Sequence, residues 1–98
     1  MVKNGDCVAI FNSIHRVMKA EKVLKELRLP ILLIPAPRPI SSDCGLAIRY
    51  SVNDREKVES VLGEAGLIPE DIFLKKENSY LNIKTLPSFN LDKDLRRI

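Results

Sequence analysis

Aromatic and metal-binding side chains are scarce in this chain. Its 98 residues include no tryptophan, two tyrosines, three phenylalanines, one histidine and two cysteines. A platform for stacking bases would have to be built from very few rings. The histidine and cysteines fall short of a tetrahedral zinc site without a carboxylate, and neither C-x-x-C nor H-x-x-x-H spacing occurs. The sequence therefore predicts no bound metal and no cofactor.

Long apolar runs are also missing. The longest aliphatic run, residues 31–34, is far shorter than the roughly 20 residues that span a bilayer. The N-terminal stretch MVKNGDCVAIF has no long apolar segment and no small-residue cleavage site of the kind found in secretory signals. We therefore expect a cytoplasmic protein that does not contact membranes, with its two cysteines present as free thiols.

Signatures of common enzyme classes are not found either. There is no Gly-rich phosphate loop, no G-x-S-x-G and no convincing carboxylate pair at a predicted site. Hydrolase and dehydrogenase functions are unsupported, and it stays open whether the protein is an enzyme at all. The net charge of +3, with 30% charged residues, describes a mixed surface and is too weak to indicate a nucleic-acid partner.

What the sequence does contain is an alternation of short apolar runs and helical periodicity, in the order β-α-β-β-α-β. Strands are expected at 8–11, 31–34, 46–50 and 72–75, an extra strand at 80–84, and helices at 14–27 and from an Asn53 or Asp54 cap to Gly66. The first helix carries its apolar positions at Ile14, Val17, Met18, Leu24 and Leu27. We expect one domain over 1–98, with a core at about 6–85 and a tail at 86–98. The tail is predicted to form a short helix docked on the core or on a second subunit, which leaves a homodimer open.

This order is that of the ferredoxin-like α+β sandwich, with two helices on one face of an antiparallel sheet. A right-handed crossover makes the first two strands parallel and places the third between them. The first helix would then begin at the sheet edge where the second strand ends and the third begins. Prolines 35, 37 and 39 should make the connection after the second strand stiff and unable to join a ladder.

That connection, PAPRPISSDCG at 35–45, carries the most informative cysteine, Cys44. Its thiol would become a nucleophile as thiolate, which a helix N-terminus and Arg38 favour and Asp43 opposes. Gly45 leaves room for a bulky partner, and Ser41 and Ser42 can donate hydrogen bonds to an anion. Ser13 and His15 would lie at the same edge, at the start of the first helix.

Plainer interpretations exist for each of these residues. A cysteine that begins a strand is often a small buried hydrophobe, and a histidine in a first helical turn is often a solvated or capping residue. Cys7 should lie at the opposite end of the first strand, roughly 15 Å from Cys44. We therefore predict that Cys7 does not act as a resolving thiol.

Several short motifs along residues 7–75 resemble one family of short bacterial and archaeal proteins, the selenium or sulphur carrier-like proteins. The motifs are Phe-x-Ser-x-His at Phe11, Ser13 and His15; the pair Ala20 and Glu21; Pro-x-Pro-Arg ending at Arg38; and Ser-Ser-x-Cys-Gly from Ser41 to Gly45. The resemblance implies that Cys44 carries the transferred atom, that Arg38, Ser41, Ser42 and His15 line its site, and that the partners are donor and acceptor proteins. It does not cover the segment from about Lys76 onward.

Two other functions are consistent with the same sequence. One is a non-catalytic ferredoxin-like module that regulates or binds through protein–protein contacts. The weaker one is RNA binding, because RNA-recognition domains share this topology but stack bases on aromatics of the central strands, where only Phe11 and Tyr50 are available here. Nucleic acid is therefore the less favoured partner.

Overall fold

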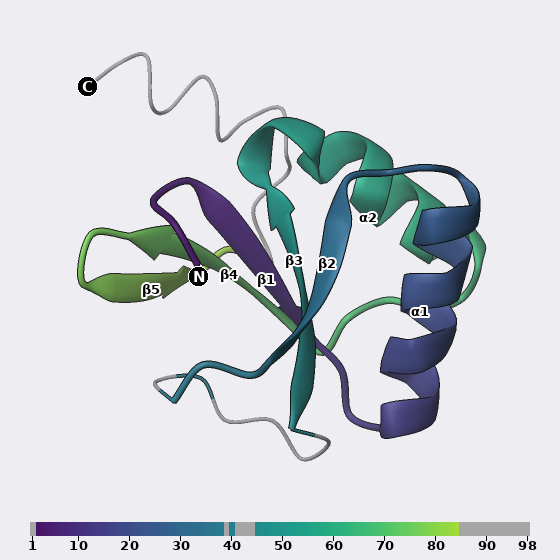
Figure 1. Cartoon of the computed structure of the whole chain (residues 1–98), viewed down its shortest axis with the longest axis horizontal. Coiled ribbons are helices and arrows are strands. Elements are labelled where there is room, and N and C mark those ends of the chain that lie inside the picture. Colours follow the sequence, from purple (N-terminus) through teal and green to yellow (C-terminus); the bar gives the residue numbers. More distant parts are fainter. Residues whose placement is uncertain (1, 39, 41–44, 85–98) are drawn as a thin grey trace.

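The computed structural model describes residues 2–38, 40 and 45–84 (Figure 1). The described residues form an α+β fold, as predicted, with one extra strand after the fourth. The elements in chain order are β1 (Asp6–Ile10), α1 (Ile14–Glu26), β2 (Ile31–Pro35), β3 (Leu46–Ser51), the 3-10 turn η1 (Val52–Asp54), α2 (Arg55–Glu64), β4 (Asp71–Lys76) and β5 (Ser79–Asn82). The predicted helix in the tail lies outside the described residues.

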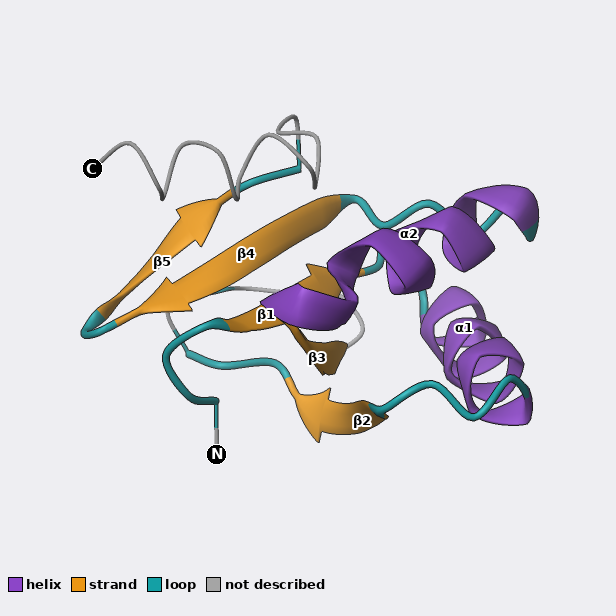
Figure 2. Cartoon of the chain, turned by 90° about the horizontal axis from the view of Figure 1, so that it is seen from above, coloured by secondary structure: helices purple, strands orange, loops and turns teal. Residues whose placement is uncertain are grey.

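The sheet has the strand order β2-β3-β1-β4-β5, and all four neighbouring pairs are antiparallel. β1 and β2 are therefore parallel with β3 between them, which is the arrangement that the crossover rule predicted. The two helices lie on the same side of the sheet (Figure 2). This architecture is compatible with a ferredoxin-like fold to which β5 adds an outer strand.

Helix α1 begins at a side-chain cap. Ser13 has extended backbone angles, and its Oγ accepts a hydrogen bond from the Arg16 N–H at 3.2 Å. Serine is among the residues that favour this position, and the predicted start of the helix at residue 14 is confirmed. The helix ends before Pro30, because Arg28 already adopts a left-handed φ of 59°.

The apolar stripe of α1 is narrower than predicted. Val17, Ala20 and Leu24 are its buried residues. The other predicted core positions are exposed, with fractions of 50% for Ile14, 44% for Met18 and 57% for Leu27. Ile14 and Met18 fall on one flank of the stripe, since i and i+4 positions drift around the helix, and Leu27 is the C-cap.

The ends of helix α2 agree with the sequence signals. Asp54 occupies the N-cap position, although its side chain makes no cap hydrogen bond, and Ala65 is the C-cap. Gly66 follows with a φ of 70°, which glycine adopts readily. The turn η1 was not predicted. Ser51 caps it by accepting a hydrogen bond from the Asn53 N–H at 3.2 Å.

Both faces of the sheet carry apolar clusters. On the helix face, β1 and β3 pack against the helices through residues such as Cys7, Ala9, Ile48 and Tyr50. On the other side, here called the open face, the buried cluster consists of Val8, Ile10, Ile34, Ile40 and Ala47. β1 contributes alternate residues to the two clusters, as expected for a central strand.

Three details of the strands differ from the prediction. Pro35 is the last residue of β2 and lies opposite Leu46, so this proline does join the ladder. The exception is allowed because β2 is one of the two outer strands of the described sheet, where a missing N–H costs no inner ladder bond. β1 starts at Asp6 instead of residue 8, and β5 starts at Ser79 because Ser79 already pairs with Lys76.

A search of the described helices for membrane spans found none that is both long enough and apolar enough to cross a bilayer.

Candidate functional site

The chain leaves the sheet after Pro35, at the end of β2, and returns to it at Leu46, at the start of β3, and the segment between these residues carries Cys44 (Figure 1). Its base is closed by a hydrogen bond of 3.0 Å from the Ala36 N–H to the Gly45 carbonyl. Gly45 is exposed and has a φ of 74°, a conformation that side chains other than glycine rarely adopt. The residue that follows Cys44 is thus held in a defined place beside the start of β3.

Ile40 anchors the same segment to the open face. Its side chain is 3% exposed and belongs to the cluster of Val8, Ile10, Ile34 and Ala47. The Ile40 N–H also donates to the Pro37 carbonyl at 2.9 Å, which closes a turn. The sequence predicts a stiff connection here but not this anchor. Its one signal is a lone aliphatic residue among prolines and serines.

The start of α1 lies at the same sheet edge as Gly45. Ile10, the last residue of β1, pairs with Ala47 near the start of β3, and the chain then runs through Phe11 and Asn12 into the cap at Ser13. The topological prediction for this edge is therefore confirmed. The orphan N–H groups and the positive end of the helix dipole face this edge of the molecule.

Four of the predicted site residues are described, and the other three lie outside the described residues. The Ser13 Oγ accepts the hydrogen bond that caps α1. His15 is exposed in the first turn of α1, Arg38 is exposed in the turn after β2, and Gly45 precedes β3. The three outside the described residues are Ser41, Ser42 and Cys44, so the proximity of Cys44 to His15 and Arg38 stays a prediction.

Cys7, by contrast, is fully buried on the helix face, one position after the start of β1 and opposite Tyr50. Burial raises the pKa of its thiol from 9.0 to about 12; the charges of Glu59 and Asp6 add to the shift, whereas the nearby Arg55 cation opposes it. Since the thiolate is the reactive form, Cys7 is inert at neutral pH.

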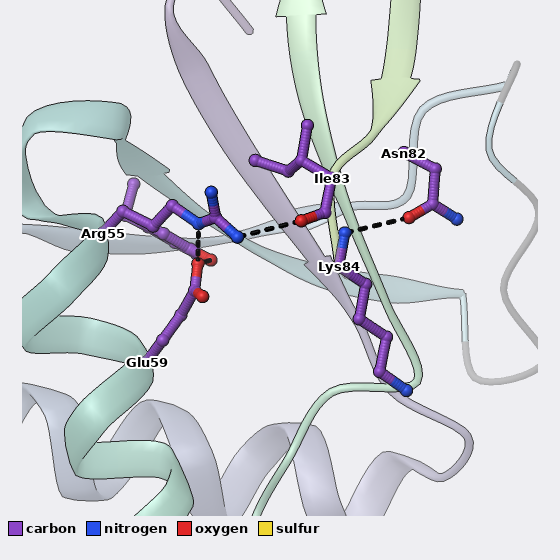
Figure 3. A network of polar contacts seen from close by, with 6 residues as sticks. Arg55, Glu59, Asn82, Ile83 and Lys84 are labelled. Atoms are coloured by element: carbon purple, nitrogen blue, oxygen red, sulfur yellow. Dashed lines mark hydrogen bonds and ion pairs between the residues drawn. The ribbon is translucent and has the colours of Figure 1, made fainter. Parts of the chain in front are cut away.

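A buried ionic cluster covers this end of the sheet, and sequence reasoning missed it. Arg55, 1% exposed, donates from Nε to the Glu59 carboxylate at 2.7 Å and from Nη2 to the Ile83 carbonyl at 2.9 Å (Figure 3). The Tyr50 hydroxyl donates to the same Glu59 oxygen at 2.9 Å, and burial raises the pKa of Tyr50 well above its usual value. The signal was weak: Arg55 precedes the buried Val58 by three positions and Glu59 by four.

The arrangement separates two chemical environments along β1. One end holds a buried, protonated thiol and a neutralised cation. The other end holds a helix N-terminus, two exposed side chains that can be cationic, His15 and Arg38, and the base of the Cys44 segment. Among the described residues, no group of three or more His, Cys, Asp or Glu side chains could hold a metal ion.

In a comparison with family models, residues 6–74 match the family described as "Putative Se/S carrier protein-like". The matched region begins with the first residue of β1 and ends within β4, so it includes the whole Cys44 segment and excludes β5. Curated proteins and solved structures gave no match.

Proposed function

We propose that this protein, which belongs to the Se/S carrier protein-like family, carries sulphur or selenium on Cys44 and delivers it to an acceptor protein. The family match, which covers more than two thirds of the chain, is the observation that carries this proposal. We place this activity in the cytoplasm, where thiols stay reduced.

The chemistry is thiol exchange at a sulphur atom. The Cys44 thiolate attacks the terminal sulphur of a donor persulfide, a new S–S bond forms on Cys44, and the donor leaves as a thiolate. An acceptor thiolate then attacks the terminal sulphur and releases the Cys44 thiolate. Each step forms one bond and breaks one bond, so no oxidant or reductant is consumed. A selenium atom would be carried in the same way.

The roles of the other residues follow from the charge that develops on sulphur. Arg38 and the N-terminal end of α1 would stabilise the Cys44 thiolate, and His15 would supply or accept a proton as the sulphur changes partners. Ser41 and Ser42 would donate hydrogen bonds to the anion, and Gly45 would give partner proteins access to it. Ser13 supports the site indirectly, because its Oγ caps the helix.

The inert state of Cys7 supports assigning the chemistry to Cys44. Cys7 is fully buried and its pKa of about 12 keeps it protonated. The chain has two cysteines, so Cys44 is the remaining candidate for a carrier thiol.

The two central-strand aromatics considered for RNA, Phe11 and Tyr50, are each 1% exposed and cannot stack on bases from the solvent.

The direct test is intact-mass spectrometry after incubation with cysteine and a cysteine desulfurase, or with a selenocysteine lyase and selenocysteine. We expect the protein to gain one sulphur or selenium atom that a reducing agent removes and that peptide mapping places on Cys44. Cys7→Ala should gain the atom equally well and Cys44→Ser should not. The proposal is wrong if Cys44 gains nothing from a panel of donors.

The reactivity of Cys44 separates the carrier from a non-catalytic binding module. A carrier thiol should react with iodoacetamide at neutral pH faster than a model thiol, because more of it is thiolate. An Arg38→Gln variant should then react more slowly, with Arg28→Gln, an exposed residue after α1, as the matched control. Labelling of Cys44 at the rate of an ordinary thiol would instead favour the binding module.

A further inference from the structure

A cavity of about 310 Å³ lies on the open face beside the segment that carries Cys44. Its lining consists of Val2, Ile34, Pro35, Ala36, Pro37, Lys75 and Tyr80. The residues come from three parts of the chain: the N-terminal stretch, the end of β2 with the start of the following connection, and the β4–β5 pair. The volume is at the small end of the range for ligand pockets, about 300–1,000 Å³.

The wall formed by the connection has apolar side chains and offers no free backbone N–H group. Pro35 and Pro37 have no N–H, and the Ala36 N–H is donated to the Gly45 carbonyl. The floor is set by Ile34, which is 2% exposed within the open-face cluster. A ligand here would meet hydrocarbon on this side and would bury an apolar body.

The opposite wall carries the charge. Lys75 and Tyr80 are directly opposite each other in the β4–β5 pair, and the Lys75 Nζ lies 4.7 Å from the centre of the Tyr80 ring. Lys75 is half-buried and is the one charged side chain among the seven described residues of the lining. The contact with the ring holds the ammonium group at the cavity.

Acidic side chains of the same face are engaged elsewhere. Asp6 pairs with Arg49 at 3.9 Å and accepts from the Lys3 N–H, and Asp71 accepts from the Asn82 side chain at 3.1 Å. Neither of these two carboxylates is paired with Lys75 in the described part of the chain, so the positive charge of Lys75 can complement an anion that enters the cavity.

We propose that this cavity is a binding site for a small carboxylate with a ring-sized apolar body, which lies against the Pro35–Pro37 wall while its carboxylate pairs with Lys75. The site is separate from the thiol chemistry, because none of its contacts requires Cys44. A ligand bound in this cavity would contact the connection that ends at Gly45, one residue from Cys44.

Two probes of the same shape test the charge requirement: 2-naphthoate and its neutral amide, 2-naphthamide. In titrations of the full chain followed by ¹H–¹⁵N NMR, both should shift the amides of Ile34, Ala36 and Tyr80, and naphthoate should bind about tenfold more tightly, the size of one partly buried ion pair. Lys75→Gln should remove that difference between the probes. Lys22→Gln, which alters an exposed lysine on α1, should leave it unchanged.

A second variant tests the wall. Tyr80→Leu should weaken binding of both probes, because it removes the aromatic ring from the lining of the cavity. The proposal is overturned if naphthoate and naphthamide bind equally to the unchanged protein, or if Lys75→Gln keeps their difference. It is also overturned if the shifts fall on Asn4, Gly5 and Lys76, which line a larger cavity of about 570 Å³ that shares Lys75. Sulphur loading of Cys44 is measured separately, so failure of this site leaves the carrier proposal standing.

Discussion

Cys7 illustrates how the position of a thiol in the fold determines its chemistry. It has no exposed surface, and burial raises its pKa to about 12 although the Arg55 cation is near. Desolvation therefore outweighs the favourable charge. The sequence alone does not distinguish the two cysteines, and the burial of Cys7 is what identifies it as a packing residue.

The raised pKa of Cys7 predicts how stability depends on pH. In the unfolded chain the thiol loses its proton near 9.0, whereas in the folded chain it keeps it until about 12. The unfolded state thus binds fewer protons between these values, so the free energy of unfolding falls as the pH rises through this window and is unaffected by this group below it. The slope due to Cys7 approaches about 1.4 kcal/mol per pH unit.

Urea unfolding at several pH values from about 8 to 10 checks this expectation for Cys7→Ala against the unchanged protein. The variant should start about 1 kcal/mol less stable, because it loses a buried sulphur, but should lose less stability as the pH rises. Tyr50, whose pKa is also raised by burial, contributes the same sign above its usual value of 10.0 in both proteins. Parallel pH profiles for the two proteins would contradict the buried, protonated state of Cys7.

At the scale of elements, Ile40 anchors the described part of the connection between β2 and β3. Ile40 is 3% exposed against β1, β2 and β3, and the Ala36–Gly45 hydrogen bond closes the base of the same segment. Removing the side chain should loosen the segment as well as the core, since both depend on the same contact.

We predict that Ile40→Ala lowers the free energy of unfolding by about 2–4 kcal/mol, the usual cost of truncating a buried isoleucine. Leu32→Ala on β2, where the leucine is 42% exposed, is the matched control and should cost less than about 1 kcal/mol. Hydrogen exchange of the Ala36 amide should also be faster in Ile40→Ala than in Leu32→Ala, after the difference in their overall free energies of unfolding has been subtracted. An Ile40→Ala variant as stable as the control would show that Ile40 does not anchor the segment.

The elements that were predicted correctly are those governed by local or chiral rules. Helix α1 begins at residue 14, Gly66 follows α2 with a positive φ, and the crossover rule placed β3 between β1 and β2. Ile40 and Arg55 escaped prediction because their burial depends on partners distant in sequence. Arg55 reaches the carbonyl of Ile83, 28 positions away, and no periodicity marks such a contact.

The same limit applies to the candidate site. Topology correctly predicted that Gly45 and the start of α1 share one edge, because strand order fixes which chain ends meet. The arrangement of side chains around Cys44 depends on the path of residues 41–44, which strand pairing does not determine. The pairing of Lys75 with Tyr80 was equally hidden, since it required the register of β4 with β5.

For the whole molecule, β1 joins the two apolar clusters. Cys7 and Ala9 belong to the helix-face cluster and Val8 and Ile10 to the open-face cluster, and all four are buried. Unfolding one cluster would expose the strand that the other needs. We therefore expect the two faces to unfold together, as parts of one domain.

The two tyrosines allow this to be measured, because the chain has no tryptophan and one tyrosine projects from each face. Tyr80 is the reporter in Tyr50→Phe, and Tyr50 is the reporter in Tyr80→Phe. In each variant the tyrosine fluorescence and the far-UV circular dichroism should give one coincident urea transition. Tyr50→Phe should unfold at a lower urea concentration than Tyr80→Phe. Its free energy of unfolding should be lower by about 1 kcal/mol, because it loses the hydrogen bond to Glu59. If the Tyr80 signal of Tyr50→Phe changed at a lower urea concentration than its circular dichroism, the open face would unfold on its own and the chain would not behave as a single cooperative domain.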